Sequence, residues 1–115
     1  MFSSVPNKIT IDAQNSPGVR PFHIADTAAE VTLSELIVTG GHVSTTQDDG
    51  GGILNEGPDT SLNNVFVTGN TAWDGGGIYN DGTIHLQDSR VSDNSSGDDG
   101  AGIYNRDYLC WILPQ

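Results

Sequence analysis

The sequence has little of several residue types on which common classes of protein depend. It contains one cysteine, Cys110, so an internal disulfide is excluded. Only four residues are Lys or Arg, against 15 Asp and Glu, which gives a net charge of −11. This balance argues against a nucleic-acid partner, because a phosphate backbone is bound through Lys and Arg. It also disfavours an anionic membrane surface, and it favours attraction of cations.

Long apolar runs are absent as well. No stretch approaches the roughly 18 consecutive apolar residues of a membrane-spanning helix, so no membrane insertion by this segment is predicted. Residues 1–6 carry neither a basic residue nor an apolar run, so we expect no signal peptide there. No segment keeps a helical period over about ten residues, which favours an all-β fold.

A glycine-rich motif dominates what is present. Residues 74–80 read Asp-Gly-Gly-Gly-Ile-Tyr-Asn, and edited copies occupy residues 49–55 and 99–105. The central isoleucines, Ile53, Ile78 and Ile103, are each 25 residues apart. A fixed period of this length is typical of a solenoid, in which each repeat stacks on its neighbours.

Each repeat contains three short segments with strand character, separated by turn residues. Such a unit cannot bury a core alone, but it can form one coil of a parallel β-helix of about three to four coils. Equivalent positions would then stack at roughly 4.8 Å, the strand spacing of a sheet. The predicted core consists of three interior columns: Ile24, Ile53, Ile78 and Ile103; Leu33, Leu62 and Leu86; Val38, Val67 and Val91.

The earliest coil is less regular. Ile24 precedes Leu33 by the same number of residues as Ile53 precedes Leu62, so the count aligns Ile24 with Ile53 and Asp26 with Asn55. Ile9 and Ile11 fall at the positions of Leu36 and Val38. The variable position occupied by Ile37, Phe66 and Arg90 is predicted to face solvent.

Two polar columns share the 25-residue period. Asn55, Asn80 and Asn105 are predicted to form a structural ladder of amides, with Asn70 and Asn94 as a shorter second one. Asp49, Asp74 and Asp99 would stack carboxylates, which repel one another. Either these turns splay into water or a cation such as Ca²⁺ lies between them, since Ca²⁺ is bound by carboxylate and carbonyl oxygens. No other cofactor is expected.

The pattern Gly-Gly-Gly-Ile-Tyr-Asn-x-Gly-Thr-Ile-x-Leu, followed by Val-Ser-x-Asn and Gly-x-Gly-Ile-Tyr-Asn, resembles the repeats of bacterial right-handed parallel β-helix proteins. It is most similar to the polymorphic outer membrane protein family, over roughly residues 8–106. The resemblance implies a right-handed β-helix of the pectin-lyase-like superfold, and a fragment of a surface-exposed or secreted protein.

The same resemblance implies a non-catalytic, adhesin-like passenger module, outside the cell or on its outer surface. A carbohydrate or a host cell-surface ligand, neighbouring β-helix coils, or another copy of the chain are then the expected partners. The repeat breaks after Asn105, so residues 1–105 are predicted to form the β-helix domain. Residues 106–115 are predicted to form a divergent apolar tail, either a cap or a truncated end.

Two rival functions stay open. A polysaccharide lyase or hydrolase is one, because this superfold hosts many; His85, Asp88 and Arg90 are the conceivable site, with a solvated strand face as the alternative. Binding of ice or carbohydrate by a flat face with Thr columns is the other, and Thr39, Thr68 and Ser92 would align for it. The sequence contains no Ser-His-Asp, P-loop or zinc-ligand spacing.

Overall fold

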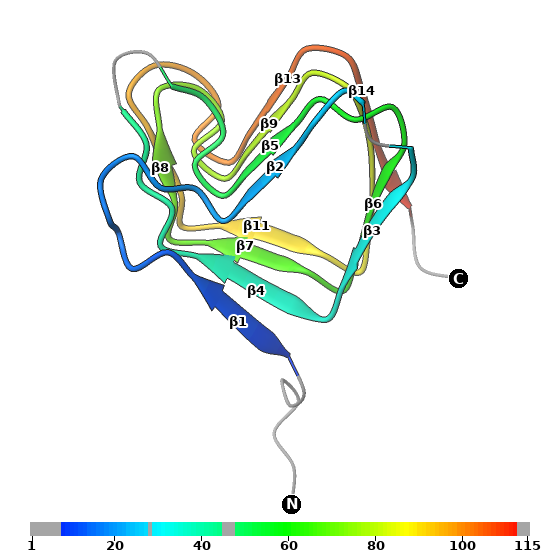
Figure 1. Cartoon of the computed structure of the whole chain (residues 1–115), viewed down its shortest axis with the longest axis horizontal. Coiled ribbons are helices and arrows are strands. Elements are labelled where there is room, and N and C mark those ends of the chain that lie inside the picture. The colour runs from blue at the N-terminus through cyan, green and yellow to red at the C-terminus, as the bar shows by residue number, and fades with distance from the viewer. Residues whose placement is uncertain (1–7, 28, 45–47, 113–115) are drawn as a thin grey trace, which may run out of the picture.

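The computed structural model describes residues 8–27, 29–44 and 48–112, and these residues form a parallel β-solenoid of about four turns (Figure 1). Every pairing between named strands is parallel and joins one coil to the next. The described residues contain no helix, and so none that could cross a membrane. The all-β solenoid predicted from the 25-residue period is confirmed.

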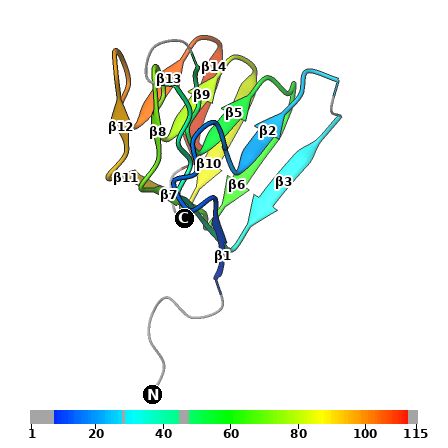
Figure 2. The same ribbon diagram turned by 60° about the vertical axis from the view of Figure 1, so that its left-hand side comes forward.

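Three four-stranded sheets form the walls of the solenoid, and a two-stranded sheet covers one corner (Figures 1 and 2). Sheet A contains β1 (Ile9–Asp12), β4 (Leu36–Thr39), β7 (Phe66–Thr68) and β11 (Arg90–Ser92). Sheet C contains β2 (Phe22–Ile24), β5 (Ile53–Asn55), β9 (Ile78–Asn80) and β13 (Ile103–Asn105). Sheet D contains β3 (Val31–Ser34), β6 (Thr60–Asn63), β10 (Thr83–Gln87) and β14 (Tyr108–Ile112). The corner sheet B contains β8 (Thr71–Ala72) and β12 (Ser95–Ser96).

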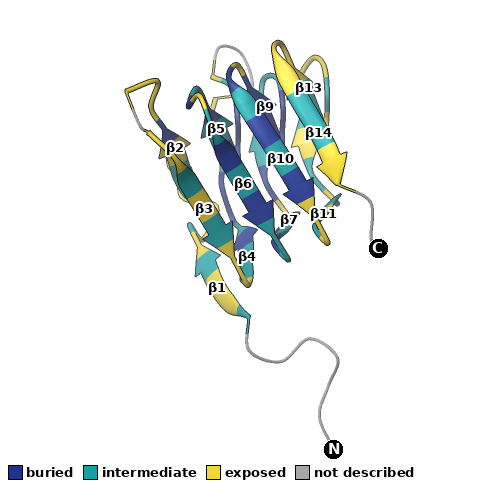
Figure 3. Cartoon of the chain, turned by 90° about the vertical axis from the view of Figure 1, so that its right-hand side faces the viewer, coloured by how far each residue is buried: buried dark blue, intermediate teal, exposed yellow. Residues whose placement is uncertain are grey.

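The core lies between the three walls and follows the predicted columns. Seven of the ten predicted residues are buried, and the other three, Leu33, Val91 and Ile103, are partly buried in the end coils and pack against the core cluster. Burial of one such side chain stabilises the fold by roughly 1.5–3 kcal/mol. Ile84 and Val65 complete the core, and both are fully buried. Figure 3 shows burial concentrated in β5, β6, β9 and β10, the strands of the two middle coils.

The register of the first coil differs from the prediction. Phe22, not Ile24, pairs with Ile53, and Ile24 pairs with Asn55. Ile24 therefore continues the asparagine column, at the position that the count gave to Asp26. The turn between β2 and β3 holds two more residues than the count allowed, and a shift of two keeps a side chain on the same face of a strand. Ile24 is accordingly still buried.

The position predicted to face solvent, occupied by Ile37, Phe66 and Arg90, forms one column along sheet A. Ile37 pairs with Phe66 and Phe66 with Arg90, and Arg90 is exposed with its guanidinium 4.8 Å from the Phe66 ring centre.

The sequence predicts a divergent tail over residues 106–115, but Tyr108–Ile112 continue sheet D in register with β10, opposite residues 83–87. Sheet D therefore continues for one more strand after the last glycine motif. Residues 113–115 lie outside the described residues.

Candidate functional site

The asparagines of the glycine motif form a continuous run of side-chain hydrogen bonds along sheet C. Asn55 donates from Nδ2 to Oδ1 of Asn80 at 2.7 Å, and Asn80 donates in the same way to Asn105 at 2.8 Å. Asn55 and Asn80 are fully buried, whereas Asn105 is exposed in the last coil. Oδ1 of Asn55 also accepts from the Thr60 hydroxyl at 2.7 Å. The amides hold three successive coils together, and those of Asn55 and Asn80 are enclosed in structural hydrogen bonds.

The second pair, Asn70 and Asn94, follows the same principle at the corner between sheets A and B. Asn70 donates from Nδ2 to Oδ1 of Asn94 at 3.0 Å, and its own Oδ1 accepts from the N–H of Gly41 at 2.9 Å. Both side chains thus connect successive coils, and both are occupied by structural contacts.

The predicted aspartate column lies on the outer rim of the glycine turn, where the carboxylates of Asp49 and Asp74 each accept a backbone N–H from the following coil. Oδ1 of Asp49 accepts from the N–H of Asp74 at 3.3 Å, and Oδ1 of Asp74 accepts from the N–H of Asp99 at 2.9 Å. A further residue meets this turn from the first coil. Arg20 donates to the carbonyl oxygens of Asp49 and Gly50 at 2.7 and 2.9 Å.

The glycines in this turn are required because the coils approach each other closely. A β-carbon at Gly76 would overlap the backbone carbonyl oxygens of Ser95 and Ala101 in the next coil. Gly75 has a φ of +63°, in the left-handed region that glycine adopts without strain. A β-carbon there would lie 2.9 Å from the Tyr79 Cα. The backbone of the glycine turn therefore passes close to the backbone of β9.

The structure brings together an acidic group that overlaps the predicted one without matching it. One carboxylate oxygen from each of Asp74, Asp98 and Asp99 lies within 4.8 Å of the others, whereas Asp49 is outside this group. Partial desolvation, followed by the charges of Asp99 and Asp74, raises the pKa of Asp98. Desolvation is also the main cause that raises the pKa of Asp49. Three carboxylates could supply part of the six to eight oxygens that Ca²⁺ takes; calcium binding stays a prediction.

Beside the rim, the outer face of sheet C carries an aromatic stack that the sequence reading did not single out. The Tyr79 and Tyr104 rings are stacked, with centroids 5.1 Å apart and planes 2° from parallel. Arg106 donates to the Tyr79 hydroxyl at 3.4 Å, and this hydrogen bond is the main cause that raises the Arg106 pKa. The signal for the stack was the repeated Ile-Tyr-Asn at 25-residue spacing.

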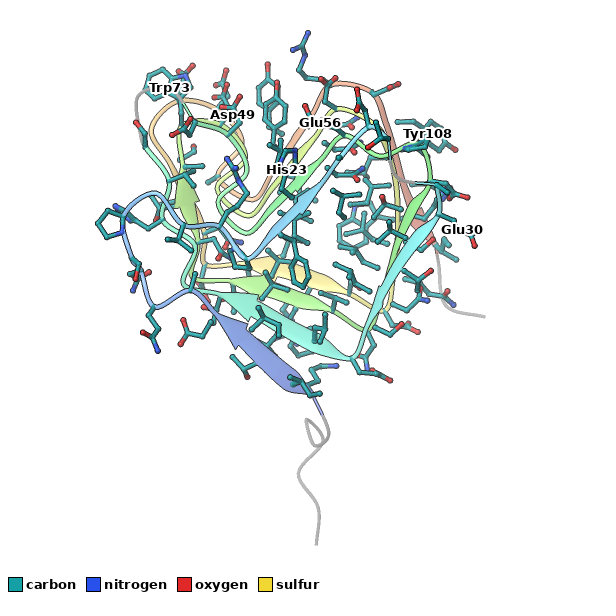
Figure 4. The ribbon with its side chains drawn as sticks, in the orientation of Figure 1. His23, Glu30, Asp49, Glu56, Trp73 and Tyr108 are labelled. Atoms are coloured by element: carbon teal, nitrogen blue, oxygen red, sulfur yellow. The ribbon has the colours of Figure 1, made fainter. Side chains whose placement is uncertain are left out.

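In the first coils, the same face carries a polar pair. His23 precedes the tyrosines in the same column, through Leu54, and its Nε2 lies 2.7 Å from Oε1 of Glu56. In Figure 4, Asp49 lies between Trp73 on one side and the His23–Glu56 pair on the other.

The predicted enzyme-like group is not assembled. Within the residues that the structure describes, no hydrogen bond or ion pair joins His85, Asp88 and Arg90. His85 meets the Tyr108 ring edge-on at 6.0 Å, Arg90 lies over Phe66, and Asp88 occupies a turn with a φ of +52°. The described residues also enclose no pocket.

Comparison with known proteins adds one match. The family model of the Chlamydia polymorphic membrane protein repeat matches residues 64–81, which run from the turn before β7 to the turn after β9. Searches of curated proteins and of solved structures returned no match. The matched stretch holds one polar corner with Asn70 and one full glycine turn. Residues 64–81 therefore match a polymorphic membrane protein repeat and lie within a parallel β-solenoid.

Proposed function

We propose that this chain is a non-catalytic surface module of the adhesin or passenger type, outside the cell or on its outer membrane. The observation that carries the proposal is the match of residues 64–81 to a polymorphic membrane protein repeat. These residues lie in a solenoid whose recurring asparagines, Asn55, Asn80 and Asn105, bond successive coils to one another. The net charge of −11 suits an exposed, soluble surface. A module of this kind presents a long, rigid outer face to its ligand.

Protease shaving of intact source cells tests the location. Peptides from the outer strands, detected by mass spectrometry before lysis, are the expected result. A chain that is cleaved only after lysis would contradict a surface location, and a periplasmic or cytoplasmic marker protein provides the control for cell integrity.

Carbohydrate is the ligand class that the outer face of sheet C favours, as the second and finer proposal. Stacked aromatic rings offer an apolar platform for sugar C–H groups, and carboxylates accept hydrogen bonds from sugar hydroxyls. Tyr104 supplies the free ring face, because Tyr79 is buried beneath it at 8% exposure. Arg106 lies beside this column and donates to the Tyr79 hydroxyl. A polysaccharide lyase or hydrolase is the alternative function, but within the described residues no hydrogen bond or ion pair joins its predicted site residues His85, Asp88 and Arg90.

A glycan array with the labelled chain tests this ligand class. Binding to one class of glycan is expected, with at least a tenfold loss in Tyr104→Ala. Tyr108→Ala is the matched control, since Tyr108 is exposed on sheet D, away from the stack. Equal losses in the two variants, or no glycan bound, would refute the carbohydrate proposal without touching the surface location.

A further inference from the structure

We propose that the two open ends of the solenoid dock head to tail, so that copies of this chain join into filaments by continuing all three sheets. The ends are formed by different strands. β1, β2 and β3 are the outermost strands of sheets A, C and D at one end, and β11, β13 and β14 are outermost at the other. Figure 3 shows β2 and β3 on one side of the molecule and β13 and β14 on the opposite side.

The later end exposes hydrogen-bonding groups that are used in every earlier coil. In the glycine turn, Gly50 and Gly51 donate their N–H groups to the following turn, and Gly75 and Gly76 repeat this with Asp99 and Gly100 at 3.1 Å. The equivalent donors, Gly100 and Ala101, have no acceptor among the residues that the structure describes. The Asp99 carboxylate likewise meets no following N–H group there.

The earlier end presents the complementary row of acceptors. Phe22 donates to the Gly52 carbonyl at 3.2 Å, as Ile53 donates to Gly77 and Ile78 donates to Gly102 at 2.9 Å. Pro21 is equivalent to Gly52 in the next coil, because Phe22 pairs with Ile53. The Gly52 carbonyl points toward the coil before it, so the Pro21 carbonyl is expected to point out of the open end. Continuing the same step, Ile103 of one copy would donate to Pro21 of the next. One end donates where the other accepts, as parallel pairing requires.

Side chains at the two ends match as well. Extending the observed registers by one coil sets Val91 opposite Ile11 of the second copy, Ile103 opposite Phe22, and Trp111 opposite Leu33. Each of the three sheets would thus gain an apolar contact in the interior column.

Both ends also carry exposed apolar side chains. Ile9 is 65% exposed at the earlier end, and at the later end Tyr108, Trp111 and Ile112 are 53%, 47% and 40% exposed. Unpaired strand edges with apolar side chains are templates for pairing with another chain.

A second copy is the occupant because it alone brings the three edges at once, in the right order around the coil. The contact is heterologous, since the later end of one copy meets the earlier end of the next, and a heterologous contact that does not close into a ring produces an open filament. The net charge of −11 per copy opposes approach at low ionic strength. Assembly is therefore expected to strengthen with salt.

Sedimentation velocity on the 115-residue chain, from 10 to 200 μM in about 0.15 and 0.5 M NaCl, tests the proposal. Wild type should show a series of species that grows with concentration and with salt. Two variants each block one end with proline at an edge position whose N–H faces outward: Thr10→Pro on β1 and Trp111→Pro on β14. Ile9 and Tyr108 donate inward, to Glu35 and Gly82, so alternation places these two N–H groups outward.

The decisive sample is the mixture of the two variants. Each variant alone should be monomeric, whereas the equimolar mixture should form dimers and nothing larger, because one unblocked later end and one unblocked earlier end remain. Trp73→Lys is the control in the middle of the solenoid, and it should assemble as wild type does. Circular dichroism checks the fold, and Thr10→Lys with Trp111→Lys replaces any proline variant that does not fold.

Two results would overturn the proposal. One is a wild-type chain that stays monomeric at 200 μM in 0.5 M NaCl. The other is a wild type that associates while the mixture of blocked variants yields no dimer, or while either blocked variant still self-associates.

Discussion

The asparagine column and the aspartate column recur in the same motif at the same spacing, yet the fold treats them in opposite ways. Asn55 and Asn80 are fully buried, whereas Asp74 and Asp99 lie on the rim of the turn. An amide both donates and accepts, so identical amides can satisfy one another in a dry stack. A carboxylate only accepts, so stacked carboxylates need a donor from elsewhere. For Asp49 and Asp74, the backbone N–H of the equivalent aspartate in the next coil is this donor.

The period therefore fixes which residues stack, and side-chain chemistry decides whether the stack can be buried. Breaking the chemistry of the buried column should cost far more than the same change at the rim.

Asn80→Asp should be the most damaging change. It replaces the donor that reaches Asn105 Oδ1 and the Tyr108 carbonyl oxygen with a buried acceptor, which leaves acceptors facing one another. Leaving such a charge unpaired costs about 3–5 kcal/mol. Urea unfolding at pH 7 measures the loss.

Asn105→Asp is the matched control, because this ladder residue is exposed in the last coil. Water can solvate the new carboxylate there, so we expect a loss of at most about 1 kcal/mol. Equal losses at the two positions would mean that burial does not distinguish them.

The glycine turn connects the two columns, and Gly76→Ala should disturb both. The added methyl group would overlap two carbonyl oxygens of the next coil, which forces the backbones apart at a cost of about 1–3 kcal/mol. Gly102→Ala is the control, because its β-carbon would meet only the Val91 side chain at 3.7 Å. Thermal unfolding of the pair measures the difference, and a Gly76→Ala midpoint as high as that of Gly102→Ala would refute the close approach.

Asp74→Asn should change the free energy of unfolding by no more than about 1 kcal/mol, in either direction. The amide oxygen can still accept from the Asp99 N–H, and the repulsion from Asp98 and Asp99 falls. The same urea experiment measures it. A loss as large as that of Asn80→Asp would remove the distinction between the columns.

The pH dependence of the rim has a definite sign. Because the fold raises the pKa of Asp98 and of Asp49, it favours their protonated forms. This contribution is fully present below the ordinary Asp pKa of about 3.9 and is lost as pH rises through the higher folded value. Asp98→Asn should thus melt above wild type at pH 7, and the gap should close by about pH 3.5. A gap that widens on acidification would show the opposite sign.

Calcium should have the smallest effect on stability, because backbone N–H groups and water already satisfy the carboxylates of the rim. We expect no rise in melting temperature at millimolar Ca²⁺ relative to Mg²⁺. A rise that is specific to Ca²⁺ and lost in Asp74→Asn would instead establish the predicted metal site at this turn.

Much of the fold could be predicted because the glycine motif keeps one spacing through the later coils. Ile53 and Ile78 lie as their spacing predicts. The register of Ile24 was misplaced because the turn after β2 is longer than its later equivalents, and spacing cannot be read through a turn of changed length. The strand at Tyr108–Ile112 was missed because its apolar residues are all different from those at the equivalent positions 83–87.

The site was harder to predict than the fold. Asp98 joins Asp74 and Asp99 in space because the turn curls, a feature that no period reveals. Arg20 reaches the carbonyls of Asp49 and Gly50 from the irregular first coil, where the repeat offers no equivalent to compare.

Hydrogen exchange of the asparagine side-chain amides, followed by NMR, tests the buried ladder most directly. The Nδ2 hydrogens of Asn55 and Asn80 should exchange at least about 100-fold more slowly than those of Asn15, which is exposed in a turn, because exchange requires local opening of the coils. Exchange of all three at the same rate would contradict a dry amide ladder, and with it the contrast between the two columns.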